Sequence, residues 1–127
     1  MFEQDYIKRI IKGIGELMIG IFIGKNAIEN NINQNNHDVC ISEDELLEFM
    51  VKKYISDGKI NEAENMLFEA IKSNKSPKNL EIALFFYDEI NKWSEEVLIN
   101  YNFSKHEIKE GLKDIKSSYE GVVNLAE

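Results

Sequence analysis

The most regular pattern of apolar residues lies near the start of the chain. Large aliphatic side chains recur there at intervals of three and four, at Ile7, Ile10, Ile11, Ile14, Leu17, Met18 and Ile21. This spacing predicts an amphipathic helix within residues 1–25. Toward its end Ile19, Phe22 and Ile23 occupy the remaining faces, so one neighbouring helix cannot cover them all. We expect the last turns to need a second partner, and a strand over Ile19–Ile23 is the alternative.

A second pattern predicts two antiparallel helices joined by a tight turn. Leu47, Val51 and Tyr54 share one face of the first helix, and Gly58 supplies the left-handed residue that ends it. Asn61 is expected to cap the second helix, with Glu64 reaching back to complete the cap. The apolar stripe of that second helix contains two alanines that permit close packing: Ala63, Leu67, Ala70 and Ile71.

From Leu47 to about Pro77 this hairpin resembles one unit of a tetratricopeptide repeat, because Tyr54, Gly58, Ala63, Leu67 and Ala70 fall in register. No second repeat follows: a shift of about 34 residues places Asp88 and Lys92 where an aromatic residue and a glycine belong. Any antiparallel helix pair with a short turn gives similar spacings, so that alternative stays open. The exposed side of the first helix, with Glu48 and Lys52, does not look like a basic clamp for a C-terminal carboxylate.

Helix-start signals mark the rest of the chain. Ser42 with Glu45 and Ser104 with Glu107 form capping boxes. Ser76-Pro77 opens a helix to about Trp93, Ser94 to Asn100 continues as a short helix, and a last helix carries Ile108, Leu112, Ile115 and Tyr119. The predicted fold is all-α, with five or six helices in one domain over residues 1–127. The helix within 1–25 packs on the hairpin, 26–41 is an asparagine-rich connector, and 42–127 is the helical body.

Composition narrows the class of protein. The 127 residues carry a net charge of −8, which argues against nucleic acid as a partner. Residues 1–25 hold four basic and three acidic side chains, so the acidity lies in the rest of the chain. A single cysteine, Cys40, and the acids Glu3 and Asp5 near the N-terminus favour a cytoplasmic protein. The longest uncharged apolar run, 17–24, is shorter than the roughly 20 residues that span a bilayer.

Residues with catalytic or metal-binding potential form no recognisable motif. His37, Asp38 and Cys40 lie close together, but one short cluster falls below a zinc signature. His106 lies in the first turn of a capped helix and is expected to be solvated. The acids Glu43, Asp44, Glu45 and Glu48 are explained as first-turn residues that favour the helix dipole. We predict no catalytic residue, no metal site and no cofactor, and we do not expect an enzyme.

The preferred function is protein–protein interaction, with another protein or with a second copy in a homodimer. The candidate interaction surface comprises Met18, Ile19, Phe22, Ile23, Tyr87 and Trp93. One alternative is peripheral membrane attachment, because Lys8, Arg9 and Lys12 adjoin the apolar stripe of the first helix; Glu3, Asp5 and Glu16 argue against it. Another is a small-ligand protein or enzyme whose site is assembled from distant residues.

Segments along nearly the whole chain together resemble a family of small helical bacterial proteins with a domain-of-unknown-function label. They are Asp5-Tyr6-Ile7 with Arg9 and Ile11, Phe22 with Gly24-Lys25, Ile60–Phe68, Ala83-Leu84 with Phe86-Tyr87, and Asn102-Phe103-Ser104 with Glu110-Gly111-Leu112 and Asp114-Ile115. The resemblance implies an all-helical fold. It brings no activity, ligand or site residue.

Overall fold

The computed structural model describes residues 3–16 and 43–126, with side chains for all of these except 44 and 121–126. The described chain is all-helical, as predicted. Residues 3–16 form the N-terminal helix. It is followed by α2 (Glu43–Ser56), α3 (Ile60–Ser73), α4 (Pro77–Asn91), α5 (Glu95–Asn100) and α6 (Lys105–Ala126). The predicted connector over 26–41 and the alternative strand over Ile19–Ile23 lie outside the described residues.

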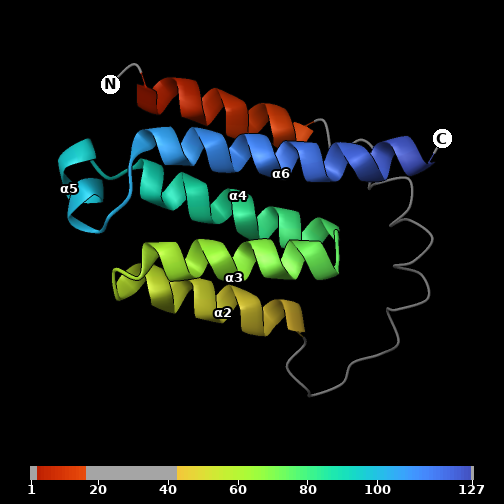
Figure 1. Cartoon of the computed structure of the whole chain (residues 1–127), viewed down its shortest axis with the longest axis horizontal. Helices are drawn as coiled ribbons and strands as arrows, with labels where there is room; N and C mark the ends of the chain where they lie inside the picture. The colour runs from red at the N-terminus through yellow and green to blue at the C-terminus, as the bar shows by residue number, and fades with distance from the viewer. Residues whose placement is uncertain (1–2, 17–42, 127) are drawn as a thin grey trace.

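Helix α4 lies at the centre of the molecule (Figure 1). It packs against α2, α3 and α6, and α2 also packs against α3. Two adjacent stripes of α4 are buried for this reason, and they supply much of the core: Leu80, Ile82, Ala83, Phe86, Tyr87 and Ile90. The short helix α5 lies at one end of the bundle, between the end of α4 and the start of α6 (Figure 1).

The turn between α2 and α3 forms as the sequence predicts. Gly58 has a φ of +77°, which a residue with a side chain rarely adopts. The Lys59 N–H donates to the Tyr54 carbonyl at 2.8 Å and the Gly58 N–H to the Ile55 carbonyl at 3.1 Å, the hydrogen-bond pair of a Schellman C-cap. Fully buried Ala63 lets the two helices approach closely. The helical hairpin is therefore confirmed, while kinship with tetratricopeptide repeats stays a prediction.

The predicted cap at Asn61 is wrong. Helix α3 begins at Ile60, and the residue before it, Lys59, makes no side-chain cap. The Asn61 amide instead donates to the Asn102 carbonyl at 3.0 Å, and Glu64 accepts a hydrogen bond from Tyr87. Both side chains bind residues that are distant in the sequence, and local spacing does not reveal such partners.

Two other predicted helix starts are confirmed. The Ser76 hydroxyl accepts from the Asn79 N–H at 3.0 Å, with Pro77 at the first helical position. The Ser104 hydroxyl accepts from the Glu107 N–H at 3.1 Å, which is one half of a capping box, and it donates to the Glu107 carboxylate at 3.4 Å. The proposed cap at Ser42 lies outside the described residues.

The N-terminal helix packs differently from the prediction. Ile7 and Ile14 are buried, but the described polar contacts of this helix run to α4 and α6. A Cβ added at Gly15 would lie 3.8 Å from Leu84 of α4. Both helices of the hairpin pack against α4, and the first helix packs on the other side of α4 (Figure 1).

Candidate interaction surface

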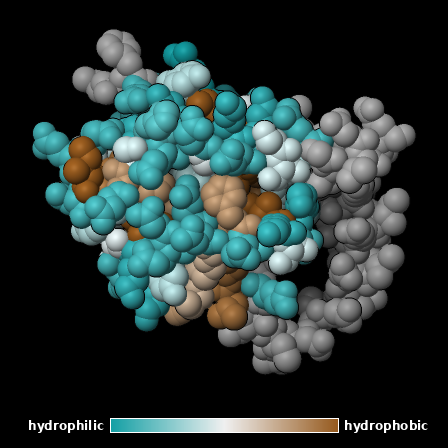
Figure 2. Space-filling view, in the orientation of Figure 1, coloured by the Kyte–Doolittle hydropathy of each residue, from teal (hydrophilic) through white to brown (hydrophobic). Residues whose placement is uncertain are grey.

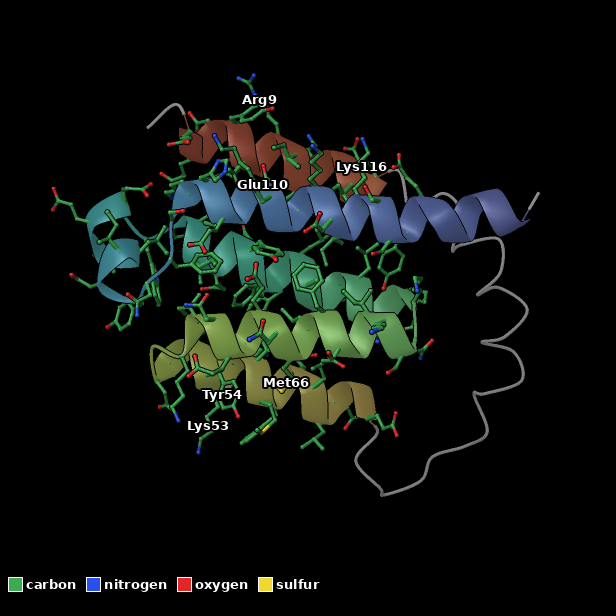
Figure 3. The ribbon with its side chains drawn as sticks, viewed as in Figure 1. Arg9, Lys53, Tyr54, Met66, Glu110 and Lys116 are labelled. Carbon is green, nitrogen blue, oxygen red and sulfur yellow. The ribbon has the colours of Figure 1, made fainter. Side chains whose placement is uncertain are left out.

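The side chains that could act in catalysis or bind a metal ion are scattered over the described residues. Within the described ranges, no three His, Cys, Asp or Glu side chains gather closely enough to hold a metal ion. His106 is exposed, as expected, and its Nε2 lies 3.8 Å from the Glu110 carboxylate on the surface of α6 (Figure 3). His37, Asp38 and Cys40 lie outside the described residues.

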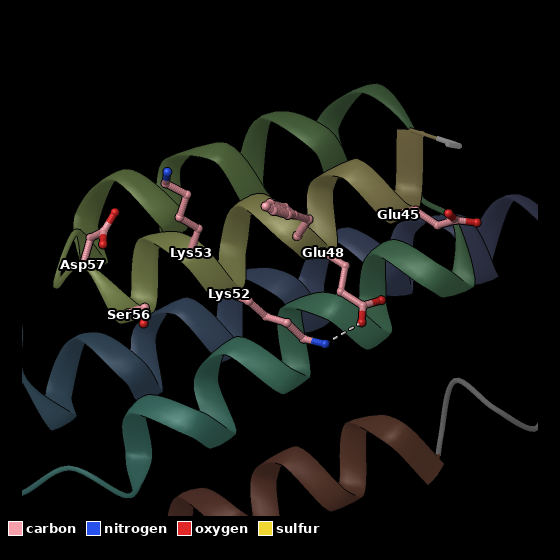
Figure 4. Close-up of a pocket in the computed structure, with 7 residues that line it drawn as sticks. Glu45, Glu48, Lys52, Lys53, Ser56 and Asp57 are labelled. Atoms are coloured by element: carbon pink, nitrogen blue, oxygen red, sulfur yellow. Dashed lines mark hydrogen bonds and ion pairs between the residues drawn. The ribbon is translucent and has the colours of Figure 1, made fainter. Parts of the chain in front are cut away.

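A groove of about 690 Å³ runs along α2 (Figure 4). Two of its charged groups bind each other, with Lys52 Nζ 2.9 Å from one Glu48 carboxylate oxygen, and Lys78 from outside the groove lies 3.1 Å from the other oxygen. These hydrogen bonds lower the pKa of Glu48. Small-molecule sites are typically apolar clefts with a few polar groups aimed at the ligand, whereas the Glu48 carboxylate at the centre of this groove is held by two lysines. It is lined by Glu45, Glu48, Phe49, Lys52, Lys53, Ser56 and Asp57.

Exposed apolar side chains lie on α2, at Leu46 and Phe49, and at α5. Val97, Ile99 and Tyr101 are exposed to 41, 60 and 42%, and half-buried Trp93 lies beside them with its ring centroid 5.5 Å from that of Tyr101. Val97 and Tyr101 lie one turn apart on one flank of the buried Leu98, and Ile99 lies on the other flank. Figure 2 shows apolar residues over α5 among hydrophilic ones. We call Trp93, Val97, Ile99 and Tyr101 the α5 surface.

Both ends of α5 are fixed by hydrogen bonds. The Ser94 hydroxyl accepts from the Val97 N–H at 3.2 Å at the first end. At the other end Asn102 takes a positive φ of 60°, and the N–H groups of Asn102 and Phe103 donate to the carbonyls of Ile99 and Leu98, both at 3.0 Å. This is the same C-cap as at Gly58, here with asparagine. A helix of six residues is thereby held in one conformation.

The turn between α2 and α3 packs against Tyr101 of the α5 surface. A Cβ added at Gly58 would lie 2.8 Å from Cδ1 of Tyr101, so the ring packs directly on the glycine backbone. The hydrogen bond from Asn61 to the Asn102 carbonyl joins the same two segments. Tyr101 therefore has a fixed position although much of its ring is exposed.

A buried polar network fixes the other side of α5. The Lys105 side chain is only 7% exposed, and its ammonium donates to the backbone and side-chain oxygens of Asn91, the latter at 3.1 Å. The Asn91 amide donates to the Gln4 carbonyl at 3.0 Å, and the Lys105 N–H donates to the Glu95 carboxylate at 3.3 Å. Burial lowers the pKa of Lys105, and Glu95 and Glu3 oppose that shift. The network ties α5 to the N-terminal helix, α4 and α6.

The structure changes which residues remain candidates for the interaction surface predicted from the sequence. Met18, Ile19, Phe22 and Ile23 lie outside the described residues. Tyr87 is fully buried, so its assignment to an exposed surface is wrong; it points between α3 and α6 because its hydroxyl bonds to Glu64. Trp93 remains, half-buried beside Tyr101.

Sequence reasoning missed Val97, Ile99 and Tyr101. The available signal was the run Val97-Leu98-Ile99 in a very short helix, since successive helical residues point about 100° apart. If one of the three faces the core, its neighbours on both sides face outward. The burial of Leu98 decides which ones are exposed.

The fold and this surface define an all-helical protein with exposed apolar side chains on both flanks of a fixed short helix at one end of its bundle. The chain belongs to DUF6483, a family of unknown function, whose family model matches residues 1–120. The family resemblance seen in the sequence is thus confirmed. Comparison with curated proteins and with solved structures finds no match. Over the ranges that the structure describes, no helix combines the length and the apolar character needed to cross a bilayer.

Proposed function

We propose that this protein is a non-enzymatic helical module that binds protein, and that the α5 surface makes the contact. The observation that carries the proposal is the exposure of Val97, Ile99 and Tyr101 on a helix fixed at both ends. Tryptophan and tyrosine are enriched among the residues that dominate binding energy at protein interfaces. Trp93 and Tyr101 provide such a pair.

The fixed position of α5 favours binding for a second reason. Ordering a mobile loop or side chain costs free energy when a complex forms, and a preorganised surface avoids much of that cost. Here the Ser94 cap, the left-handed Asn102 and the contact between Tyr101 and Gly58 order the surface before any partner arrives.

Membrane attachment through the N-terminal helix has less support. Lys8, Arg9 and Lys12 are exposed, but Ile7 and Ile14 of the same helix are buried in the protein core. An interfacial helix inserts its apolar face into the lipid, and these isoleucines are not available for that in the folded protein.

Affinity capture with matched variants tests the proposal. The intact chain, the double variant Val97→Ser/Ile99→Ser and the control Leu46→Ser/Phe49→Ser are immobilised and exposed to lysate of the source organism. The control removes two apolar side chains of similar exposure, 55 and 56%, from α2. We expect one or more proteins to be retained by the intact chain and by the control but lost with the α5 variant.

The comparison is valid only if the intact chain and both variants are folded to the same extent. Circular dichroism and thermal unfolding check that all three proteins are folded at the capture temperature. Retention of the same proteins by all three would show that the α5 surface does not make the contact.

A further inference from the structure

We propose that the α5 surface binds a second copy of this chain, on the outer face of the N-terminal helix. This inference rests on the proposed function and names the partner. The partner face comprises Lys8, Arg9 and Lys12, and we call it the basic face. The two surfaces are complementary in charge and chemistry, and each molecule carries both of them.

The α5 surface is bordered by acids. Glu95 and Glu96 lie in the first turn of α5 and Glu107 in the first turn of α6, and all three are exposed. Lys105 is buried with its ammonium turned onto Asn91, and the exposed Lys92 next to Trp93 is paired with Glu89 at 3.1 Å. A partner that covers the apolar residues at this end therefore meets negative charge around them, which favours lysine and arginine on the partner.

The basic face is an exception in an acidic protein with a net charge of −8. Lys8, Arg9 and Lys12 are all exposed, and Arg9 points away from the rest of the molecule (Figure 3). Its neighbour Tyr6, three residues before Arg9, is 54% exposed and adds apolar area to the same side. Two carboxylates share this side of the helix: exposed Asp5 lies one turn before Arg9, and Glu16 lies 4.0 Å from Lys12 Nζ. Three basic and two acidic side chains leave the basic face a net charge of +1.

The side chains of the two surfaces match in kind as well as in charge. An arginine guanidinium stacks favourably on aromatic rings, and exposed Tyr101 with half-buried Trp93 beside it supplies them. Lysine and arginine stems also cover apolar side chains such as Val97 and Ile99 while their charged ends reach carboxylates. Tyrosine, tryptophan and arginine are enriched at protein interfaces, and the two surfaces together contain all three.

The position of the two surfaces permits a closed pair. Hydrogen bonds from Asn91 to Gln4 and from Lys109 to Glu3 hold the start of the N-terminal helix against the end of α4 and the start of α6, from which α5 extends (Figure 1). The basic face begins one turn farther along that helix, with Arg9 over its middle part (Figure 3). A two-fold axis would form the contact twice, with each copy giving its α5 surface to the basic face of the other.

Charge reversal with complementation tests this arrangement. Light scattering and sedimentation over a range of concentrations give the dissociation constant of the intact chain, of Arg9→Glu and of Glu96→Lys. We expect the intact chain to form a dimer that weakens as salt is raised. Each single variant should dimerise at least about tenfold more weakly, because like charges then oppose each other at both contacts.

An equal mixture of the two variants should recover dimers, since every contact in the mixed pair again joins opposite charges. The double variant Arg9→Glu/Glu96→Lys should dimerise with itself for the same reason. Lys72→Glu reverses the charge of an exposed side chain in the last turn of α3. It is the control and should leave dimerisation unchanged. Recovery in the mixture excludes misfolding as the cause of the single-variant losses.

Three results would overturn the inference: a monomeric intact chain at all concentrations, a dimer unaffected by both reversals, or no recovery on mixing. The capture experiment remains independent of these results. A monomeric chain that still retains a different protein through Val97 and Ile99 would overturn self-association and leave the proposed function standing.

Discussion

The Tyr87 hydroxyl donates a 2.7 Å hydrogen bond to the Glu64 carboxylate, and this bond joins the centre of α4 to α3. Gly111 of α6 lies directly over the pair: a Cβ added there would be 2.6 Å from Tyr87 Cζ and 2.9 Å from Glu64 Oε2. Three helices therefore meet at one polar contact inside an apolar core. Tyr87 is fully buried and Glu64 half-buried, so neither group is well hydrated.

The surroundings of the pair favour a protonated carboxyl group. Burial raises the pKa of Glu64, and the nearby charges of Glu107 and Asp114 raise it further, against the opposing effect of the Tyr87 hydrogen bond. Burial and the Glu64 charge also raise the pKa of Tyr87, which therefore remains a hydrogen-bond donor at neutral pH.

Glu64→Gln should make stability less sensitive to pH. The pKa of Glu64 is higher in the folded than in the unfolded chain, so the folded chain holds the proton more tightly. The stabilisation from this group is complete below the unfolded pKa and is lost as pH rises through the folded pKa. Urea unfolding between pH 4 and pH 8 should show the variant gaining stability relative to the intact chain as pH rises.

Glu69→Gln, an exposed carboxyl group on the same helix, is the control and should not change the slope. An equal pH dependence in the intact chain and Glu64→Gln would contradict the raised pKa.

Tyr87→Phe should destabilise the fold by about 1–3 kcal/mol at neutral pH, because a half-buried carboxylate then loses its donor. The loss should shrink toward pH 4, where Glu64 is protonated. Chemical denaturation of Tyr87→Phe, Glu64→Gln and the double variant forms a cycle that measures the coupling of the pair. Additive free energies would mean that the hydrogen bond contributes nothing measurable to stability.

Gly111→Ala should destabilise the protein although alanine favours helices. The new methyl group would overlap Tyr87 and Glu64, and overpacking of this kind typically costs about 1–3 kcal/mol. Gly13→Ala is the matched control, because a Cβ at Gly13 meets nothing within 4 Å. That variant should gain up to about 1 kcal/mol from helix propensity alone. Thermal unfolding should therefore shift in opposite directions for the two substitutions, and a shift in the same direction would refute the close contact at Gly111.

The elements of this fold follow from short-range sequence signals. Gly58, Ser76 with Pro77, and Ser104 with Glu107 act within a few residues of the helix ends they define, so the sequence predicts them correctly. Long-range partners are different. Local spacing favours Asn61 and Glu64 as a cap, yet their partners lie 41 and 23 residues away.

The candidate site depends on the same kind of long-range information. Which residue of Val97-Leu98-Ile99 faces inward is decided by the way α5 meets the α2–α3 turn and the start of α6. Nothing within that run distinguishes the three. Tyr87 of α4 shows the opposite error, because the sequence predicts it on an exposed surface but it is buried. Its hydroxyl binds Glu64 on another helix.

The turn beneath Tyr101 offers a final test that links stability to the α5 surface. Gly58→Ala should cost at least about 1–2 kcal/mol, the typical penalty for a side chain in the left-handed region, and should also displace the Tyr101 ring from its contact with the glycine. Asn102→Gly is the complementary variant, because its φ of 60° suits glycine at least as well as asparagine, and it should leave stability unchanged or slightly raised. Denaturant unfolding gives both free energies, and the fluorescence of Trp93, the sole tryptophan, reports movement of its neighbour Tyr101. A spectral change in folded Gly58→Ala, absent in Asn102→Gly, would show that the hairpin turn positions the α5 surface, whereas identical spectra would show that Tyr101 keeps its place without the glycine.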